Sequence, residues 1–211
     1  MENKNIIITI NREFGTDGRE IAKELANLLG VKVYDKALLD AALNELNITR
    51  EELEKATSDN SNWWNGFLGL YKKFGNQSTV DQKEHVTSKT IYAAEKKLMM
   101  DIAERESCVI VGRTAFAIFK NHPNAVKILL IADDEARVKR VMETEDLSLT
   151  EARKFVKNID GERDKYIEKF AGVSRYDARN YDFVLNVTGI PTHLVAVFLA
   201  QNIRLKFKDI L

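Results

Sequence analysis

The sequence predicts an α/β fold, a three-layer α/β/α sandwich around a mainly parallel five-stranded sheet. Three observations support this prediction. Short apolar runs typical of buried strands alternate with segments of helical periodicity along most of the chain. The first run, IIITI at residues 6–10, is continuous and β-branched, as expected of a strand buried on both faces of a parallel sheet. The length of 211 residues suits one compact domain, so we treat residues 1–211 as a single domain.

The first strand leads through a glycine-containing loop into a helix. The helix is expected to end at Gly30, because glycine is a common residue just after a helix. Its apolar face is formed by Ile21, Leu25, Leu28 and Leu29. A short strand is expected at 31–35, followed by a helix at 37–46 and another from Thr49, where Glu52 completes a capping box.

The middle of the chain breaks this alternation. Residues 58–83 combine polar stretches with aromatic side chains, and we interpret them as an insertion. The aromatic side chains are Trp63, Trp64, Phe67, Tyr71 and Phe74. The preferred interpretation is that they pack a small core of their own or form a homodimer contact, and the alternative is that they line a ligand pocket.

The second half of the chain resumes the alternation. The expected elements are a helix at 84–105, a strand at 108–112, a short helix at 113–120, a strand at 126–132 and a helix at 135–144. Asp133 is placed to cap the last of these, and Ser148 with Glu151 forms a capping box before a charged helix at 152–170. A strand at 181–187 follows. Pro191 suits the first turn of a terminal helix. The apolar face expected for that helix is Leu194, Val195, Phe198 and Leu199.

Composition excludes several classes of protein. The 32 basic and 32 acidic residues balance, so no global field attracts nucleic acid or an anionic membrane. No uninterrupted apolar run approaches the ~20 residues that span a bilayer. Cys108, in the apolar stretch CVIV, is the single cysteine, which excludes an internal disulfide and indicates a reducing compartment. We therefore expect a cytoplasmic protein that holds any phosphate ligand by local contacts.

The loop after the first strand resembles a phosphate-binding loop without its lysine. The Walker A pattern GxxxxGK[ST] places backbone N–H groups around phosphates, and its lysine and hydroxyl complete the site. Aligned on Gly18, this chain reads EFGTDGRE at residues 13–20, with Arg19 in the lysine position and Glu20 in the hydroxyl position. Gly15 and Gly18 permit the close backbone approach that phosphate needs.

Two interpretations of this loop stay open on spacing alone. In the first, residues Gly15, Thr16, Asp17, Gly18, Arg19 and Glu20 bind the phosphates of a nucleotide. Arg19 then supplies the positive charge, and Glu20 is an oxygen ligand of a magnesium ion. In the second, the loop is an ordinary turn between strand and helix, and Glu20 only favours the positive end of the helix.

Four segments together indicate a family. NREFGTDGREIAKELANLLG, VYDKALLDAA, CVIVGRTAFAIF and YDFVLNVT occur in this order over nearly the whole chain except the insertion. Their combination resembles the cytidylate-kinase-like family of P-loop nucleotide kinases. The family's own loop typically reads GREFGSGGREIA, so it shares Arg19 and Glu20, whereas Asn11 and Asp17 stand where glycines are usual.

The resemblance implies a site and a reaction. It implies a P-loop NTPase fold with a helical lid at about 148–172, and transfer of the terminal phosphoryl group of ATP, with Mg²⁺, to a nucleoside monophosphate or similar small acceptor. Asp35, Gly112 and Arg113 end strands where the family contacts its substrate. Asp160 and Arg163 form a DxxR pair, in which aspartate contacts the substrate base or an orienting arginine and arginine approaches the transferred phosphoryl group.

Each implied role has a simpler alternative. Asp35 can cap the following helix, Arg113 can form a surface salt bridge, and Asp160 with Arg163 can be an i,i+3 ion pair. Cytidylate kinases proper carry a tyrosine and an arginine where this chain reads LLDAA, and an acidic residue where it has Thr114. Cytosine recognition is therefore not implied. The competing functions are a nucleotide-binding regulator with little turnover and a kinase with a non-nucleotide acceptor.

Overall fold

The computed structural model describes residues 4–35 and 88–208. The helices expected at 37–46 and from Thr49, and the insertion at 58–83, lie outside the described residues. The strands are β1 (Ile7–Arg12), β2 (Lys32–Tyr34), β3 (Cys108–Val111), β4 (Ala125–Ile131) and β5 (Phe183–Asn186). The helices are α1 (Gly18–Leu29), α5 (Ser88–Arg105), α6 (Ala115–Ile118), α7 (Asp134–Glu145), α8 (Leu149–Ala171), the 3₁₀ helix η1 (Ala178–Asn180) and α9 (Thr192–Lys206).

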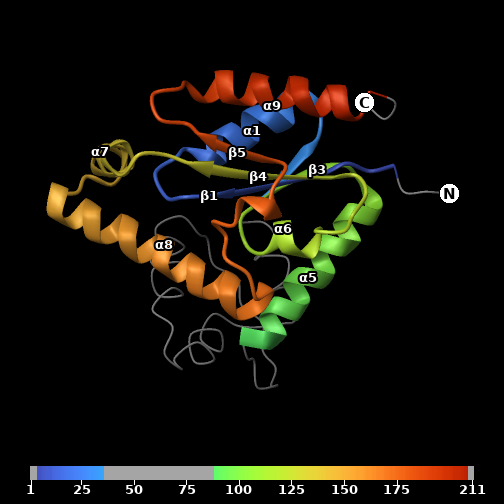
Figure 1. Ribbon diagram of the computed structural model, residues 1–211, viewed down its shortest axis with the longest axis horizontal. Coiled ribbons are helices and arrows are strands. Elements are labelled where there is room, and N and C mark those ends of the chain that lie inside the picture. Colours follow the sequence, from blue (N-terminus) through green and yellow to red (C-terminus); the bar gives the residue numbers. More distant parts are fainter. Residues whose placement is uncertain (1–3, 36–87, 209–211) are drawn as a thin grey trace, which may run out of the picture.

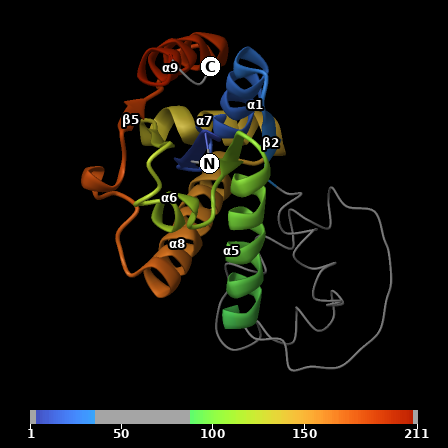
Figure 2. The ribbon, with the colours of Figure 1, turned by 90° about the vertical axis from the view of Figure 1, so that its right-hand side faces the viewer.

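The strands form one sheet in the order β2-β3-β1-β4-β5, and every neighbouring pair is parallel. Helices α1 and α9 cover one face, and α5, α6 and α8 lie on the other, as two perpendicular views agree (Figures 1 and 2). The predicted α/β/α sandwich with a five-stranded sheet is therefore confirmed. No helix in the described ranges is long and apolar enough to cross a membrane.

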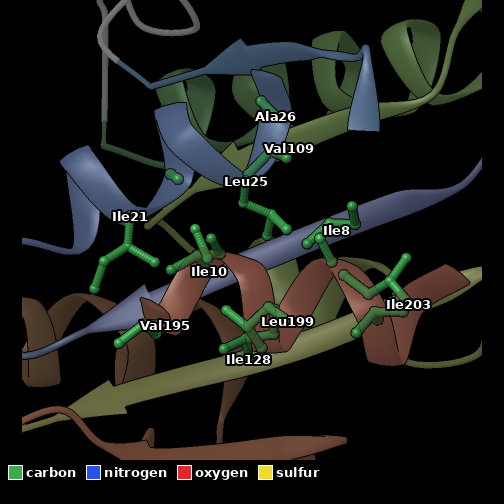
Figure 3. Close-up of a cluster of buried hydrophobic side chains, with 14 of the residues drawn as sticks. Ile8, Ile10, Ile21, Leu25, Ala26, Val109, Ile128, Val195, Leu199 and Ile203 are labelled. Atoms are coloured by element: carbon green, nitrogen blue, oxygen red, sulfur yellow. The ribbon is translucent and has the colours of Figure 1, made fainter. Parts of the chain in front are cut away.

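The central strand β1 explains why the first apolar run is continuous. Ile8 and Ile10 pack with α1 and α9, whereas Ile7 packs with α5 and α6 on the opposite face. Figure 3 shows the first of these clusters, where Leu25 of α1 and Leu199 of α9 meet the sheet. Full burial of each such isoleucine side chain contributes roughly 1.5–3 kcal/mol, and the buried polar residues Thr9 and Asn11 lie in the same strand.

The expected apolar faces of α1 and α9 are partly wrong. Leu28 is 39% exposed, Leu194 is 51% exposed and Phe198 is 45% exposed, whereas Val195 and Leu199 are buried. Successive residues of a helix point about 100° apart. Because Val195 and Leu199 pack against the sheet, Leu194 and Phe198 lie on the flank of the helix. Asp133 occupies the N-cap position of α7 as expected, but its side chain caps no N–H and instead accepts a hydrogen bond from Asn186 Nδ2 at 3.0 Å.

The capping box at the start of α8 is confirmed. The Ser148 hydroxyl accepts the Glu151 N–H, and the Glu151 carboxylate accepts the Ser148 N–H at 3.0 Å. We expect Ser148→Ala to lower the free energy of unfolding by about 1 kcal/mol, measured by urea denaturation, because helix donors lose their acceptor. Thr150→Ala is the control, since Thr150 is exposed in the same turn. An equal loss in both variants would contradict a specific capping effect.

Candidate functional site at the carboxyl edge of the sheet

The loop between β1 and α1 has a shape that only small residues allow. Gly15 has a positive φ of 85°, and a Cβ atom placed on it would lie 2.8 Å from the backbone oxygen of Arg137 in α7. The Thr16 hydroxyl donates to the Glu13 carbonyl at 2.9 Å and closes the turn. Asp17 also has a positive φ, 54°, and its carboxylate pairs with Arg140 of α7. Burial raises the pKa of Asp17 above its usual value.

This shape leaves backbone donors open. Among the described residues, no protein acceptor is bound by the N–H groups of Gly15 and of residues 17–20. Residues 18–20 belong to the first turn of α1, where N–H groups have no partner within the helix. A run of open N–H groups at a helix N-terminus is the arrangement that binds phosphate in proteins. The loop can therefore hold an anion through its main chain.

Asp160 of α8 fixes the loop in place. It is only 7% exposed, and its Oδ1 accepts the Phe14 N–H at 2.9 Å. Its carboxylate also contacts three guanidinium groups, with Arg137 at 2.6 Å, Arg175 at 3.2 Å and Arg163 at 3.4 Å. The predicted pairing of Asp160 with Arg163 is present within this larger cluster. The carboxylate thus connects the loop to α7, to α8 and to the segment after α8.

Arg163 reaches the same loop from α8. Its Nη1 donates to the main-chain oxygen of Arg12 at 3.2 Å, and its guanidinium lies 5.4 Å from the centre of the Phe14 ring. Burial, followed by the positive charge of Arg12, lowers the pKa of Arg163 to about 9. The group is still protonated at neutral pH, but its charge is costly there. A bound anion would relieve that cost.

Arg19 and Asp35, predicted on separate elements, come together. Arg19 Nε lies 2.6 Å from Asp35 Oδ2, and the Arg19 side chain is 57% exposed. Asp35 follows β2 at the same edge of the sheet, and its Oδ1 lies 3.9 Å from Arg12 Nη2. Glu20 is exposed and pairs with Lys23 at 2.9 Å on the surface of α1. The predicted contact of Glu20 with a magnesium ion, direct or through a water molecule, stays a prediction.

The β3 end presents a second charged group. Gly112 and Arg113 have positive φ angles of 83° and 55°. Arg113 Nη2 lies 3.0 Å from Glu95 Oε1 of α5, and the guanidinium lies 5.3 Å from the centre of the Tyr166 ring. The alternative expectation of a salt bridge is met, but the pair is buried and not at the surface, since the Arg113 side chain is 14% exposed and that of Glu95 only 2%.

Tyr166 completes this buried group. Its hydroxyl donates to Glu95 Oε2 at 2.6 Å, so Glu95 receives one contact from α8 and one from the β3 end. Burial, followed by the negative charge of Glu95, raises the pKa of Tyr166 well above its usual value. The tyrosine therefore stays a neutral hydrogen-bond donor. This group holds Arg113 at the carboxyl edge of the sheet, beside Gly112.

Two cations of the site were not predicted. Arg12 ends β1 immediately before the loop, and Arg175 follows α8 with a side chain that is fully buried. Arg175 Nη1 donates to the main-chain oxygen of Arg12 at 3.1 Å and its Nε lies 2.5 Å from Asp164. Arg12 could have been found, because it stands within NREFG at the end of a buried strand. Arg175 lies in a polar segment with no such signal.

A family model and several solved structures match this chain. The model of the cytidylate kinase-like family matches residues 7–189. No curated protein matches the chain. A crystal structure of an uncharacterized protein from Eubacterium ventriosum ATCC 27560 has 25% sequence identity and a TM-score of 0.66, covering 94% of this chain and 98% of that chain.

Two further solved structures show the fold alone. TT1252 from Thermus thermophilus has 20% identity and a TM-score of 0.54, with 95% of this chain and 98% of that chain covered. Shikimate kinase from Acinetobacter baumannii in complex with shikimate has 12% identity and a TM-score of 0.53, with 97% and 96% covered. The fold is that of the P-loop kinases, and the family supports a phosphotransferase in general. Since the family model spans most of the chain, from β1 to the segment after β5, the chain belongs to the cytidylate kinase-like family.

Proposed function

We propose that this protein transfers the terminal phosphoryl group of ATP to a nucleoside monophosphate or a similar small acceptor. The observation that carries the proposal is the run of open N–H groups at Gly15 and residues 17–20, held in place by Asp160 and flanked by arginines. Phosphoryl transfer depends on positioning the reactants and neutralising charge, and this edge of the sheet supplies both kinds of group. Each role below follows from a contact already described.

The donor phosphates would lie against the loop, and a hollow beside it suits the base. This hollow, of about 400 Å³, is lined by Asp133, Asp134, Glu135 and Ala136 at the start of α7 and by Thr188 after β5. It adjoins the loop because Gly15 packs against the backbone of Arg137, one residue further along α7. Acidic side chains at such a place favour a base that donates hydrogen bonds, as the amino group of adenine does.

The described residues also fit a magnesium ion carried by the nucleotide. They contain no cluster of three or more histidine, cysteine or acidic side chains that could form a cage for a metal. Mg²⁺ in phosphotransferases is usually held by substrate phosphates, several waters and one or two carboxylates. Asp35 at the β2 end and the predicted ligand Glu20 would supply such carboxylates. When bound, the ion would neutralise part of the phosphate charge.

The chain's own cations would complete the reaction. Arg163 lies beside the loop and has only a long contact of 3.4 Å to Asp160, so it would stabilise the negative charge of the phosphoryl group in transfer. Arg113, held by Glu95 at the β3 end, would orient an anionic acceptor. The contacts of Asp160 and Arg163 hold α8 against the loop, and this would exclude water from that side of the bound donor.

A second candidate function is a nucleotide-binding regulator with little turnover. The observation in its favour is that Arg19, in the position of the Walker A lysine, forms an ion pair with Asp35. In this arrangement its charge is not directed at the phosphate site. The acceptor residues of cytidylate kinases are also missing from the sequence, as LLDAA and Thr114 show. A kinase with a non-nucleotide acceptor is the third reading. All three bind a phosphate donor and differ in turnover and acceptor.

The test is ADP production from ATP and Mg²⁺ against a panel of nucleoside monophosphates and small hydroxy acids. We expect turnover that depends on one acceptor class, and its loss in Gly15→Ala, because the new Cβ meets Arg137 and distorts the N–H array. Gly172→Ala is the matched control, since Gly172 also has a positive φ, 66°, but no atom within 4 Å of the added carbon. Silence across the panel, with ATP still bound, would contradict the kinase and favour the regulator.

A further inference from the structure

Arg12 occupies a central place at the carboxyl edge of the sheet. Its side chain runs from the second glycine of the loop toward the β3 end. A Cβ atom on Gly18 would lie 2.9 Å from Arg12 Cγ, and one on Gly112 would lie 2.0 Å from Arg12 Nη1. Both glycines therefore leave room for this one side chain. The guanidinium lies between the loop, where donor phosphates would bind, and the strand end that carries Arg113.

The guanidinium of Arg12 has few partners. Its side chain is 15% exposed, and its ion pair among the described residues is with Asp35 at 3.9 Å, beyond hydrogen-bond distance. In the same part of the chain it donates no hydrogen bond, although a guanidinium has five N–H donors. The neighbouring Arg137 and Arg175, in contrast, lie 2.6 Å and 2.5 Å from carboxylates. Those two arginines are already neutralised.

The surroundings of Arg12 are strongly positive. The positive charges of Arg19, Arg113 and Arg175 all act on it. The negative charge of Asp35 lies closer to Arg19, at 2.6 Å, than to Arg12, at 3.9 Å. Burial, together with these like charges, lowers the pKa of Arg12 below its ordinary value. A partly buried cation whose side chain donates no hydrogen bond to the described residues is unfavourable for the folded protein. A ligand anion at this place would supply the missing acceptors.

We propose that Arg12, from the strand that precedes the loop, binds the terminal phosphate of the donor and replaces the Walker A lysine. This inference rests on the proposed function and adds a residue to it. Arg19 stands in the lysine position of the sequence, but it is 57% exposed and paired with Asp35 at 2.6 Å. Arg12 is the more buried of the two and faces the interval between the loop and Gly112. Its planar fork suits two phosphate oxygens at once.

The experiment compares Arg12→Met and Arg19→Met, with Arg179→Met as control because the Arg179 side chain is 90% exposed. Binding of inorganic tripolyphosphate with Mg²⁺ is measured by calorimetry, since this probe tests the phosphate site without a base. We expect Arg12→Met to weaken binding by about 10–100-fold, the loss of a charged hydrogen-bonding group, and Arg19→Met to weaken it by less than about threefold. Melting of the unliganded proteins is measured in parallel.

Unliganded Arg12→Met should melt no lower than the parent protein, because methionine fills a similar volume and removes a poorly paired charge. A purely structural arginine would instead destabilise the fold when removed. Arg12→Lys is the second variant and should fold and recover part of the affinity. Loss of fold in both variants, or loss of binding in Arg19→Met alone, would overturn the proposal. Failure of the parent protein to bind either tripolyphosphate or ATP would overturn the proposed function itself.

Discussion

Replacement of Asp160 by alanine is expected to lower the free energy of unfolding by about 3–5 kcal/mol, the usual cost of removing one partner from a buried ion pair. The carboxylate contacts Arg137 at 2.6 Å, Arg175 at 3.2 Å and Arg163 at 3.4 Å, and the first two are almost completely buried. It also accepts the Phe14 N–H at 2.9 Å, so the loop loses an anchor as well. Urea denaturation followed by circular dichroism measures the change.

Two further variants separate the charge from the hydrogen bond. Asp160→Asn keeps an oxygen that accepts the Phe14 N–H but removes the negative charge. Its free energy of unfolding should therefore lie between those of the parent protein and of Asp160→Ala. Glu168→Ala, an exposed acid of the same helix, is the control for removing a carboxylate from α8. A loss below about 1 kcal/mol in Asp160→Ala would show that the arginines find other acceptors, and the cluster would then not fix the loop.

Replacement of Arg163 by alanine is expected to reduce kcat by about 10³-fold, the lower end of the range known for arginines that stabilise phosphoryl transfer. Arg163 lies 3.2 Å from the Arg12 main-chain oxygen, beside the open N–H groups of the loop. Its guanidinium has one long contact to Asp160 and is only 25% exposed. Interaction with the transferred group should be strongest in the transition state, so the KM for ATP should change much less than kcat.

The control for this prediction is Arg153→Ala, an exposed arginine on the same helix. Thermal melting of the unliganded Arg163→Ala protein is measured in parallel, so that the effect of losing the contacts to the Arg12 main-chain oxygen and to Asp160 on folding is separated from the effect on kcat. A rise in the KM for ATP with unchanged kcat would assign Arg163 to ground-state binding of the donor. A variant with full turnover would remove Arg163 from the reaction.

The parts of the fold that depend on neighbouring residues could be predicted from the sequence. Three such predictions are confirmed, namely the strand in the apolar run at β1, the start of a helix at Gly18 and the capping box of Ser148 and Glu151. Each depends on only a few neighbouring residues. Family resemblance placed the loop, Asp35 and Gly112 at strand ends and Arg163 on a lid-like helix, and in the structure Arg163 of α8 contacts the main chain of Arg12 before the loop. Their roles toward ligands stay predictions.

Contacts between distant residues could not be predicted in the same way. Phe14 and Asp160 are 146 positions apart, and neither residue type indicates that a carboxylate will bind that particular main-chain N–H. The exposure of Leu194 and Phe198 has the same origin, because the packing of α9 on the sheet decides which flank is covered. Periodicity shows that a helix is apolar on one side but leaves the exact angle of contact open.

The main-chain oxygen of Arg12 has a consequence for sequence variation within the family. It accepts hydrogen bonds from Arg163 at 3.2 Å and from Arg175 at 3.1 Å. Every residue type provides this carbonyl, so position 12 can change without disturbing either bond. Substitutions at 12 and 163 therefore need not occur together in relatives, and covariation would not reveal this contact. Any coupled variation between the two positions would instead report the side chains, through the repulsion between their charges or through a ligand that both bind.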